Sequence, residues 1–288
     1  MDTPAVAEVT DCSARLAAWL RPHRRLFVLT GAGISTGAGI PDYRDGDGGW
    51  KRARPITFQQ FRSDAGARRR YWARSHAGWP VVSRAKPTAA HRALAAAEAA
   101  GRVHALVTQN VDGLHGAAGH RRVIDLHGRI DRLICLECAG TWPRAELQDW
   151  LDRRFPRPDA RSAPDGDADL ESIPPGFRIP DCPHCGGMIK PDVVFFGENV
   201  PRPRVDAAMA ALAETDALLV VGSSLMVWSG YRFVRAAREL GMPCCAVNLG
   251  RTRADPLLDL RIAADCDAAL AGFAGGGSTA ADSVTRGR

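Results

Sequence analysis

Residues 26–35 read Leu-Phe-Val-Leu-Thr-Gly-Ala-Gly-Ile-Ser, so that an apolar run passes directly into a glycine-rich turn. Continuous apolar strands of this kind are typical of parallel sheets that are covered on both faces by helices. Glycines after such a strand let the backbone approach a pyrophosphate, and the N–H groups of a following helix start meet its charge. A tight turn without a ligand is the alternative for this motif alone, because its spacing differs from G-x-G-x-x-G.

Four more apolar runs read as buried strands, and helical patterns alternate with them. This alternation predicts an α/β fold, a Rossmann-like doubly wound parallel sheet. The further strands are expected at 103–108, 123–126, 217–221 and 244–249, and the helices at 12–21, 65–78, 89–100, 143–154, 203–213 and 229–240. Pro80 is expected to follow the end of the second helix.

The composition changes after residue 130, which predicts an insertion into the α/β domain. Residues 131–189 hold two cysteine pairs and a stretch rich in Pro, Asp and Gly, so they are expected to form a small zinc-binding module. The Rossmann-like domain would then comprise residues 12–130 and 190–272. The ends, residues 1–11 and 275–288, are expected to be flexible tails.

The cysteine pairs are Cys135/Cys138 and Cys182/Cys185, two C-x-x-C knuckles. Four thiolates suit a closed, tetrahedral, structural Zn²⁺ site, which has no open position for catalysis. A redox-active C-x-x-C is the alternative, although one pair would suffice for that chemistry.

Composition and charge exclude several classes of protein. The chain has 288 residues, a net charge of +6 and 45% hydrophobic residues, as in a folded globular protein. Basic residues are spread along the chain and not gathered in a dense arm, so no specific nucleic-acid partner is expected. Since we find no apolar stretch of about 18 residues and no secretory signal, we expect a cytoplasmic protein without a membrane span.

Polar residues follow several of the predicted strands, where open α/β sheets bind ligands. Gln109, Asn110 and Asp112 come after the second strand, and His127 follows the third. A histidine there suits general base catalysis near neutral pH, although a surface or core histidine is the alternative for any single one. The acidic residue that a simple dehydrogenase carries after its second strand is not evident, which argues against hydride transfer.

Taken together, these motifs resemble the sirtuin family of NAD-dependent protein lysine deacylases. The resemblance runs in family order over about residues 12–270, nearly the whole chain. Besides both cysteine pairs, the matching segments are 31–35, 39–44, 108–112 (Thr-Gln-Asn-Val-Asp), 127–128, 190–198 (Lys-Pro-Asp-Val-Val-Phe-Phe-Gly-Glu) and 222–225. The runs at 71–74, 195–198 and 229–233 look most like the class II branch.

The resemblance implies roles for individual residues. His127 would be the catalytic base, and Val194 and Phe196 would flank the tunnel for the acylated lysine. The protein substrate would dock as an added strand in the cleft between the two domains. The residues that would contact NAD are Gly31, Ala32, Gly33, Ile40, Asp42, Tyr43, Arg44, Gln109, Asn110, Val111, Asp112, Gly222, Ser223, Ser224, Asn248, Leu249, Gly250 and Cys266.

Several positions depart from the family pattern. Much of the family has Phe in place of Tyr43, Thr in place of Ser223 and Pro in place of Ser229. These changes lie near the cofactor and bear on acyl preference and rate more than on the reaction. Tyr71 and Arg74 have the Tyr-x-x-Arg spacing that another sirtuin class uses for acidic acyl groups, with a solvated helix face as the alternative.

The reaction that the resemblance implies consumes NAD. Nicotinamide leaves, the acyl oxygen of the modified lysine attacks the ribose carbon, and His127 removes a proton from a ribose hydroxyl. Water then releases free lysine and O-acyl-ADP-ribose. Two alternatives from other classes are a protein ADP-ribosyltransferase that uses NAD and a non-catalytic zinc-ribbon module that binds nucleic acid.

Overall fold

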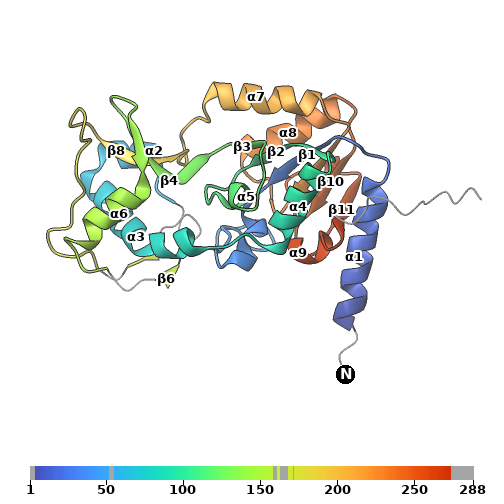
Figure 1. Ribbon diagram of the computed structural model, residues 1–288, viewed down its shortest axis with the longest axis horizontal. Coiled ribbons are helices and arrows are strands. Elements are labelled where there is room, and N and C mark those ends of the chain that lie inside the picture. The colour runs from blue at the N-terminus through green and yellow to red at the C-terminus, as the bar shows by residue number, and fades with distance from the viewer. Residues whose placement is uncertain (1–3, 52–54, 158–160, 163–167, 171, 274–288) are drawn as a thin grey trace, which may run out of the picture.

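The main sheet has six strands, all parallel, in the order β11-β10-β9-β1-β2-β3 (Figure 1). The structure, a computed structural model, describes residues 4–51, 55–157, 161–162, 168–170 and 172–273. All five predicted strands are in this sheet, and the sixth, β11, was not predicted. The strands are β1 (Leu26–Thr30), β2 (Val103–Thr108), β3 (Val123–Asp125), β9 (Ala217–Val221), β10 (Cys244–Val247) and β11 (Leu260–Ile262).

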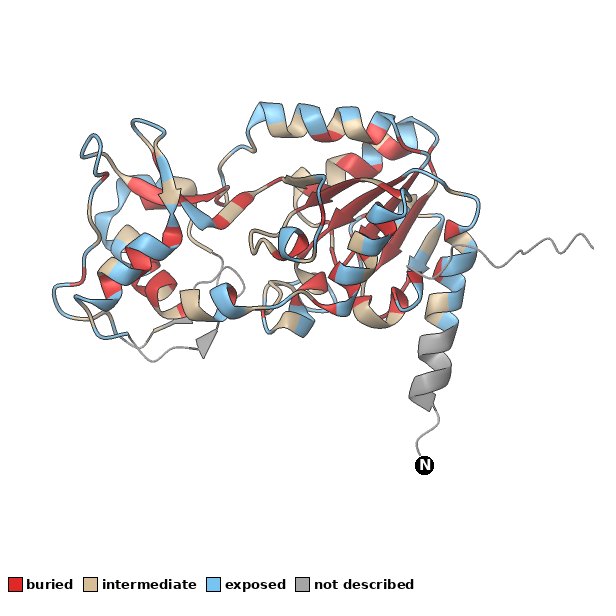
Figure 2. Cartoon of the chain, viewed as in Figure 1, coloured by how far each residue is buried: buried red, intermediate tan, exposed pale blue. Residues whose placement is uncertain are grey.

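Helices cover both faces of this sheet, as the continuous apolar strands predict. Along β1 the side chains alternate, so Val28 belongs to one hydrophobic cluster and Leu29 to the other. Figure 2 shows the sheet as a buried layer between them. One face is covered by α1 (Pro4–Leu20), α4 (Ala89–Ala99) and α9 (Cys266–Ala269), the other by α7 (Arg202–Ala213) and α8 (Trp228–Glu239).

A smaller unit lies beside the main sheet and is built on three antiparallel strands, in the order β5-β4-β8. Its hydrophobic cluster joins Leu133 of the sheet and Leu151 of a covering helix to Trp72, from far earlier in the chain. The elements are β4 (Gly128–Cys135), β5 (Thr141–Pro143), β8 (Ile189–Val193), α6 (Arg144–Asp152), α2 (Phe58–Ser63), α3 (Ala65–Arg84) and the short pair β6 (Arg161–Ser162) and β7 (Ala168–Asp169). The boundaries 131–189 stay a prediction, to which we propose adding α2 and α3.

Helix α3 passes through Pro80, so the prediction that it ends before this proline is wrong. Proline has no N–H to donate to the carbonyl four residues earlier, which belongs to His76. Gln148 on α6 donates from Nε2 to that carbonyl oxygen over 3.2 Å. Because a side chain of another helix satisfies the freed acceptor, the helix can continue to Arg84.

Other boundaries also differ from the sequence predictions. Helix α1 begins at Pro4, so most of the predicted N-terminal tail is helical. The turn after β1 opens two 3-10 helices, Ala32–Ile34 and Thr36–Ala38, in place of the expected α-helix. The sequence also predicts an extended segment at 193–196, but strand β8 ends at Val193. It predicts a long surface loop at 156–181, and parts of this loop, like the C-terminal tail, lie outside the described residues.

Helices α5 (Leu114–Ala117) and the 3-10 helix Asp255–Leu257 complete the described elements. Among the described helices, none has the length and apolar character needed to cross a membrane.

Candidate active site and metal centre

A cavity of about 670 Å³ opens at the carboxyl ends of the parallel strands. Strands β1 and β9 are neighbours, and from this pair the chain builds the sheet outward in both directions. Such a topological switch point leaves a crevice at the strand ends, where open α/β sheets bind ligands. The volume lies within the range of about 300–1,000 Å³ that is usual for small-molecule and cofactor sites.

The glycines after β1 bring two turns into contact in the cavity wall. Gly33 N–H donates to the carbonyl oxygen of Gly222 over 2.8 Å. A Cβ atom on Gly33 would lie 2.9 Å from the Cα of Gly222, and one on Gly31 would lie 2.7 Å from the Cβ of Ser223. Glycine is therefore needed at these positions for the close approach of the β1 and β9 turns. This packing requirement holds whether or not a pyrophosphate binds there.

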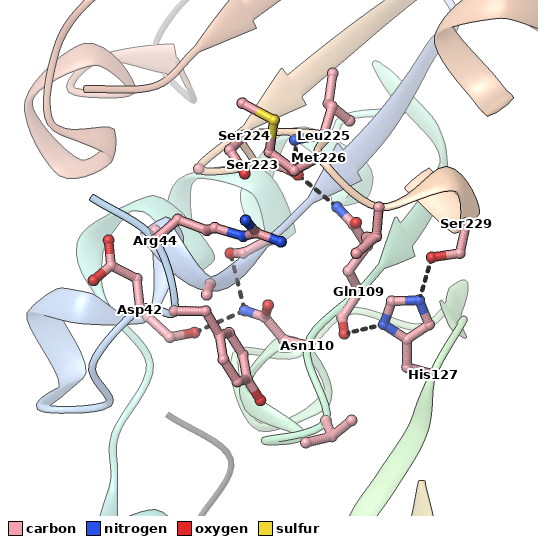
Figure 3. Close-up of a pocket in the computed structure, with 18 of the residues that line it drawn as sticks. Asp42, Arg44, Gln109, Asn110, His127, Ser223, Ser224, Leu225, Met226 and Ser229 are labelled. Carbon is pink, nitrogen blue, oxygen red and sulfur yellow. Dashed lines mark hydrogen bonds between the residues drawn. The ribbon is translucent and has the colours of Figure 1, made fainter. Parts of the chain in front are cut away.

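Hydrogen bonds hold the polar residues after β2 in the cavity wall (Figure 3). Gln109 donates from Nε2 to Ser223 Oγ over 2.7 Å, which ties the end of β2 to the end of β9. Asn110 donates from Nδ2 to Ser35 Oγ over 3.0 Å, and Ser35 in turn donates to Asp112 Oδ2 over 2.7 Å. Burial raises the pKa of the Asp112 carboxyl, while hydrogen bonds from Leu114 N–H and Ser35 oppose this shift.

His127 lies between β3 and β4, and both its ring nitrogens have partners (Figure 3). Nδ1 is 2.8 Å from the carbonyl oxygen of Gln109, and Nε2 is 2.8 Å from Ser229 Oγ. A carbonyl can only accept, so Nδ1 carries the proton and Nε2 holds the lone pair of the neutral ring. Desolvation by the surrounding protein lowers the pKa of His127 to about 4, so the ring is neutral at pH 7 and Nε2 carries no proton.

An aromatic cluster joins the segment after the 3-10 helix Thr36–Ala38 to the segment after β8. The rings of Tyr43, Trp50 and Phe196 lie 5.3–6.3 Å apart, centroid to centroid, in edge-to-face arrangements. The guanidinium of Arg44 lies 3.8 Å from the centroid of the Trp50 ring. All four side chains line the cavity, so this cluster forms part of its wall.

The metal centre lies apart from the cavity, at the end of the β4–β8 pair. Cys135 Sγ is 3.5 Å from Cys185 Sγ, and Cys138 Sγ is 3.7 Å from Cys182 Sγ. All four sulfur atoms lie within 4.8 Å of one another. Tetrahedral Zn–S bonds of about 2.3 Å place sulfur atoms about 3.8 Å apart, so the cluster fits a structural Zn²⁺.

Comparison with known proteins agrees with this geometry. The model of the Sir2 family matches residues 31–229. The chain belongs to the Sir2 family.

Several relatives of this Sir2-family chain are similar over nearly its whole length. An NAD-dependent protein deacetylase 2 from Bradyrhizobium diazoefficiens is 58% identical, covering 86% of this chain and 93% of the relative. An NAD-dependent protein deacetylase from Xanthomonas campestris pv. campestris (strain 8004) is 55% identical, covering 91% of each.

Solved Sir2 structures have the same fold. One described as "Sir2-p53 peptide-NAD+" has a TM-score of 0.74 at 28% identity, covering 91% of this chain and 98% of that one. Another, described as "Structural Basis for the Mechanism and Regulation of Sir2 Enzymes", has a TM-score of 0.72 at 31% identity, covering 92% and 97%. The predicted family and fold class are therefore confirmed, whereas the class II branch stays a prediction.

The structure of the Sir2-family chain brings almost all predicted site residues to one cavity. Tyr71 is only 4% exposed and packs against Phe61 and Phe195. Arg74, one turn further along α3, is not among the described residues that line the cavity. The predicted residues that do line it are Gly31, Ala32, Gly33, Ile40, Asp42, Tyr43, Arg44, Tyr71, Gln109, Asn110, Val111, Asp112, His127, Val194, Phe196, Gly222, Ser223, Ser224, Asn248, Leu249, Gly250 and Cys266.

Sequence reasoning missed other side chains of the cavity wall. Ser35, Ser229 and Arg232 line the cavity, and two of them hydrogen bond to predicted residues. Ser35 stands inside the glycine-rich motif, so its position after β1 was a usable signal. Ser229 was expected near the cofactor as a departure from the family pattern, but its contact to His127 was not predicted, because it joins residues that are far apart in the chain. Arg232 was not predicted as a site residue.

Proposed function

We propose that this chain is an NAD-dependent protein lysine deacylase, which transfers the acyl group of a modified lysine to ADP-ribose and releases nicotinamide. The observation that carries the proposal is the unprotonated Nε2 atom of His127 in the wall of a dinucleotide-sized cavity at the switch point of the sheet. The names of the relatives and the fold of the Sir2 structure with peptide and NAD⁺ support it.

The donors and acceptors of the cavity wall fit a dinucleotide. The Asn248 amide donates from Nδ2 to Gly250 O over 2.9 Å, which makes Oδ1 the group that would accept from a ribose hydroxyl. The buried Nε of Arg232 has no hydrogen-bond partner among the described residues, so a polar ligand group would satisfy it. The predicted NAD contacts that line the cavity, named above, are proposed to hold the cofactor.

His127 is proposed as the general base. Gln109 O accepts from Nδ1–H and so keeps the lone pair on Nε2, the atom that would take a proton from a ribose hydroxyl. NAD supplies the ribose carbon that accepts the acyl oxygen. The chain is proposed to orient the reactants and to exclude water from them. The aromatic cluster of Tyr43, Trp50 and Phe196 in the cavity wall would exclude the water.

The acyl-lysine is proposed to enter between the two units, past Val194 and Phe196. Neighbouring wall residues such as Ile40 and Ile130 are apolar and suit an uncharged acyl chain. An acidic acyl group would need Arg74 to reach the cavity together with Tyr71. The geometry favours acetyl and other uncharged acyl groups over acidic ones.

A product analysis tests the proposal. The full chain is incubated with NAD and a panel of acetyl-, succinyl-, glutaryl-, lipoyl- and long-chain acyl-lysine peptides, and the products are identified by mass spectrometry. Free lysine peptide together with O-acyl-ADP-ribose is expected. ADP-ribosylated protein without deacylation would favour the transferase alternative, and intact NAD with every peptide, in folded and zinc-loaded protein, would reject both.

The cytoplasmic location is also a proposal. A site of four thiolates requires reduced cysteines, which that compartment maintains.

A further inference from the structure

The donor and the acceptor in the hydrogen bond between Ser229 and His127 can be assigned. Because Nδ1 donates to the Gln109 carbonyl, the neutral ring presents a lone pair at Nε2. Ser229 Oγ lies 2.8 Å from Nε2, so its hydroxyl must be the donor in this hydrogen bond (Figure 3). The atom expected to act as the base is therefore already hydrogen bonded to a side chain of the protein.

We propose that Ser229 is a positioning residue for His127, which holds the Nε2 side of the ring at the cavity wall and yields its place to the reacting hydroxyl of the ligand. The inference rests on the proposed function, since it concerns the same base. Ser229 is also one of the positions where the sequence departs from the family pattern.

The start of α8 places Ser229 beside the ring. Ser229 is the second residue of this helix, whose N-cap is Val227. The next residue, Gly230, is buried, and a Cβ atom there would lie 2.4 Å from Oε1 of Gln109. The helix start can thus approach Gln109, the residue whose carbonyl binds the other ring nitrogen. Gln109 and Ser229, which lie close together, therefore hold the two ring nitrogens of His127.

The hydroxyl exchange follows from the geometry of imidazole. Nε2 has a single lone pair in the ring plane, and Ser229 donates its hydrogen bond to it. A ribose hydroxyl can donate to Nε2 only after Ser229 has rotated about its side-chain bond. The proton then passes from the ribose hydroxyl to Nε2, and Ser229 keeps its own proton. Ser229 is thus not consumed or charged in the step.

Removing the Ser229 hydroxyl should change the basicity of His127. A hydrogen bond donated to the neutral ring disfavours the imidazolium, so its loss raises the pKa. The charged groups that act on the ring are Arg204 of α7 and Arg232 of α8, and both lower the pKa of His127 after desolvation by burial. These groups are unchanged in a Ser229 variant, so a shift would report the lost hydrogen bond.

The direct test is a ¹⁵N NMR titration of the histidines in the ligand-free full chain. Wild type, S229A and S229T are compared, with S63A, an exposed serine on α2, as the matched control. H127A identifies the His127 signals among the eight histidines. We expect the Nδ1–H tautomer in wild type and a midpoint about 0.5–1 pH unit higher in S229A. S229T and S63A should titrate like wild type.

A kinetic test uses the same variants on an acetyl-lysine peptide. The acid limb of the pH profile of kcat/KM should move to higher pH in S229A and return in S229T. Coincident midpoints for S229A and wild type, an Nε2–H tautomer in wild type, or a threonine variant that behaves like alanine would overturn the inference. If wild type itself consumes no NAD, the proposed function fails, while the NMR titration still decides the role of Ser229.

Discussion

The proposed base, His127, depends on two hydrogen bonds that fix the tautomer and the position of its imidazole ring. Its position in the chain, after the third strand, was predicted, and the structure places it in the cavity wall. The tautomer could not be predicted, because it is set by the backbone of Gln109 and by Ser229, which lies far from His127 in the sequence. A general base within reach of its proton contributes about 10²–10⁴-fold to a rate.

His127→Ala is therefore expected to lower kcat/KM for deacylation by about 10²–10⁴-fold and to leave NAD affinity within a few-fold of wild type. Peptide deacylation measured by mass spectrometry and NAD binding measured by calorimetry check the two parts. His23→Ala, a half-buried histidine near the end of α1, is the matched control and should retain full activity. Full activity of the His127 variant would reject the base assignment.

Two glycines of the cavity wall give a second prediction at this scale. Gly33→Ala forces a Cβ to within 2.9 Å of the Gly222 backbone, whereas a Cβ at Gly46 meets no atom within 4 Å. Gly33→Ala should lower the free energy of unfolding by about 1–3 kcal/mol and weaken NAD binding. Gly46→Ala should change it by less than about 0.5 kcal/mol. Urea unfolding measures the difference, and equal effects of the two substitutions would contradict it.

At the scale of elements, the strands of the main sheet were the most predictable part. Three of the five predicted strands, β1, β9 and β10, are short apolar runs that are buried on both faces, and this pattern is visible without tertiary information. Helix α3 was harder, because its passage through Pro80 depends on Gln148 of another helix. Strands β4 and β11 were missed: β4 is partly exposed with mixed polarity, and β11 has only three residues.

One cysteine knuckle lies at the end of β4 and the other lies before β8, and the zinc site that they form gives a testable prediction. Cys182→Ala removes one of four thiolates, so the zinc content measured by elemental analysis should fall well below one per chain. The thermal midpoint should fall by more than about 5 °C, because metal binding contributes to folding. Cys12→Ala, a half-buried cysteine on α1, should keep its zinc. A Cys182 variant with full zinc and an unchanged midpoint would refute the structural site.

For the whole molecule, the candidate site was predicted better than its surroundings. Residues at strand ends gather at one edge of a parallel sheet, so sequence position alone placed most of the cavity wall. Arg74 is the exception among the predicted lining residues. Its place depends on how α3 packs in the smaller unit, and α3 belongs to a hydrophobic cluster, many of whose other members come from residues 130–195.

A cluster of buried histidines makes global stability depend on pH. His91, His115 and His120 lie with ring centroids 4.6 Å and 5.1 Å apart. Desolvation lowers the pKa of His91 to about 4, that of His115 well below its usual value, and also that of His120. Because the unfolded chain takes up these protons near pH 6.5, it binds more protons than the folded state below that pH.

The free energy of unfolding should therefore fall as the pH falls from about 6.5 toward 4, by up to about 1.4 kcal/mol per pH unit for each histidine. Urea unfolding at a series of pH values measures this slope. His115→Gln removes one titrating ring and should make this slope shallower, while Ser63→Ala, which removes no titrating group, should leave the slope unchanged. The same slope in the His115 variant would show that other groups cause the acid sensitivity.

The early place of α2 and α3 in the chain has a consequence for synthesis. The side chains of Phe61 and Tyr71 pack against Phe195, which is translated much later. At roughly 5–20 residues per second, a ribosome needs on the order of 5–20 s to add the intervening hundred or so residues. Throughout that interval the nascent polypeptide carries an aromatic-rich helix without its cover, so a chaperone that shields it should raise the yield of active enzyme in cells.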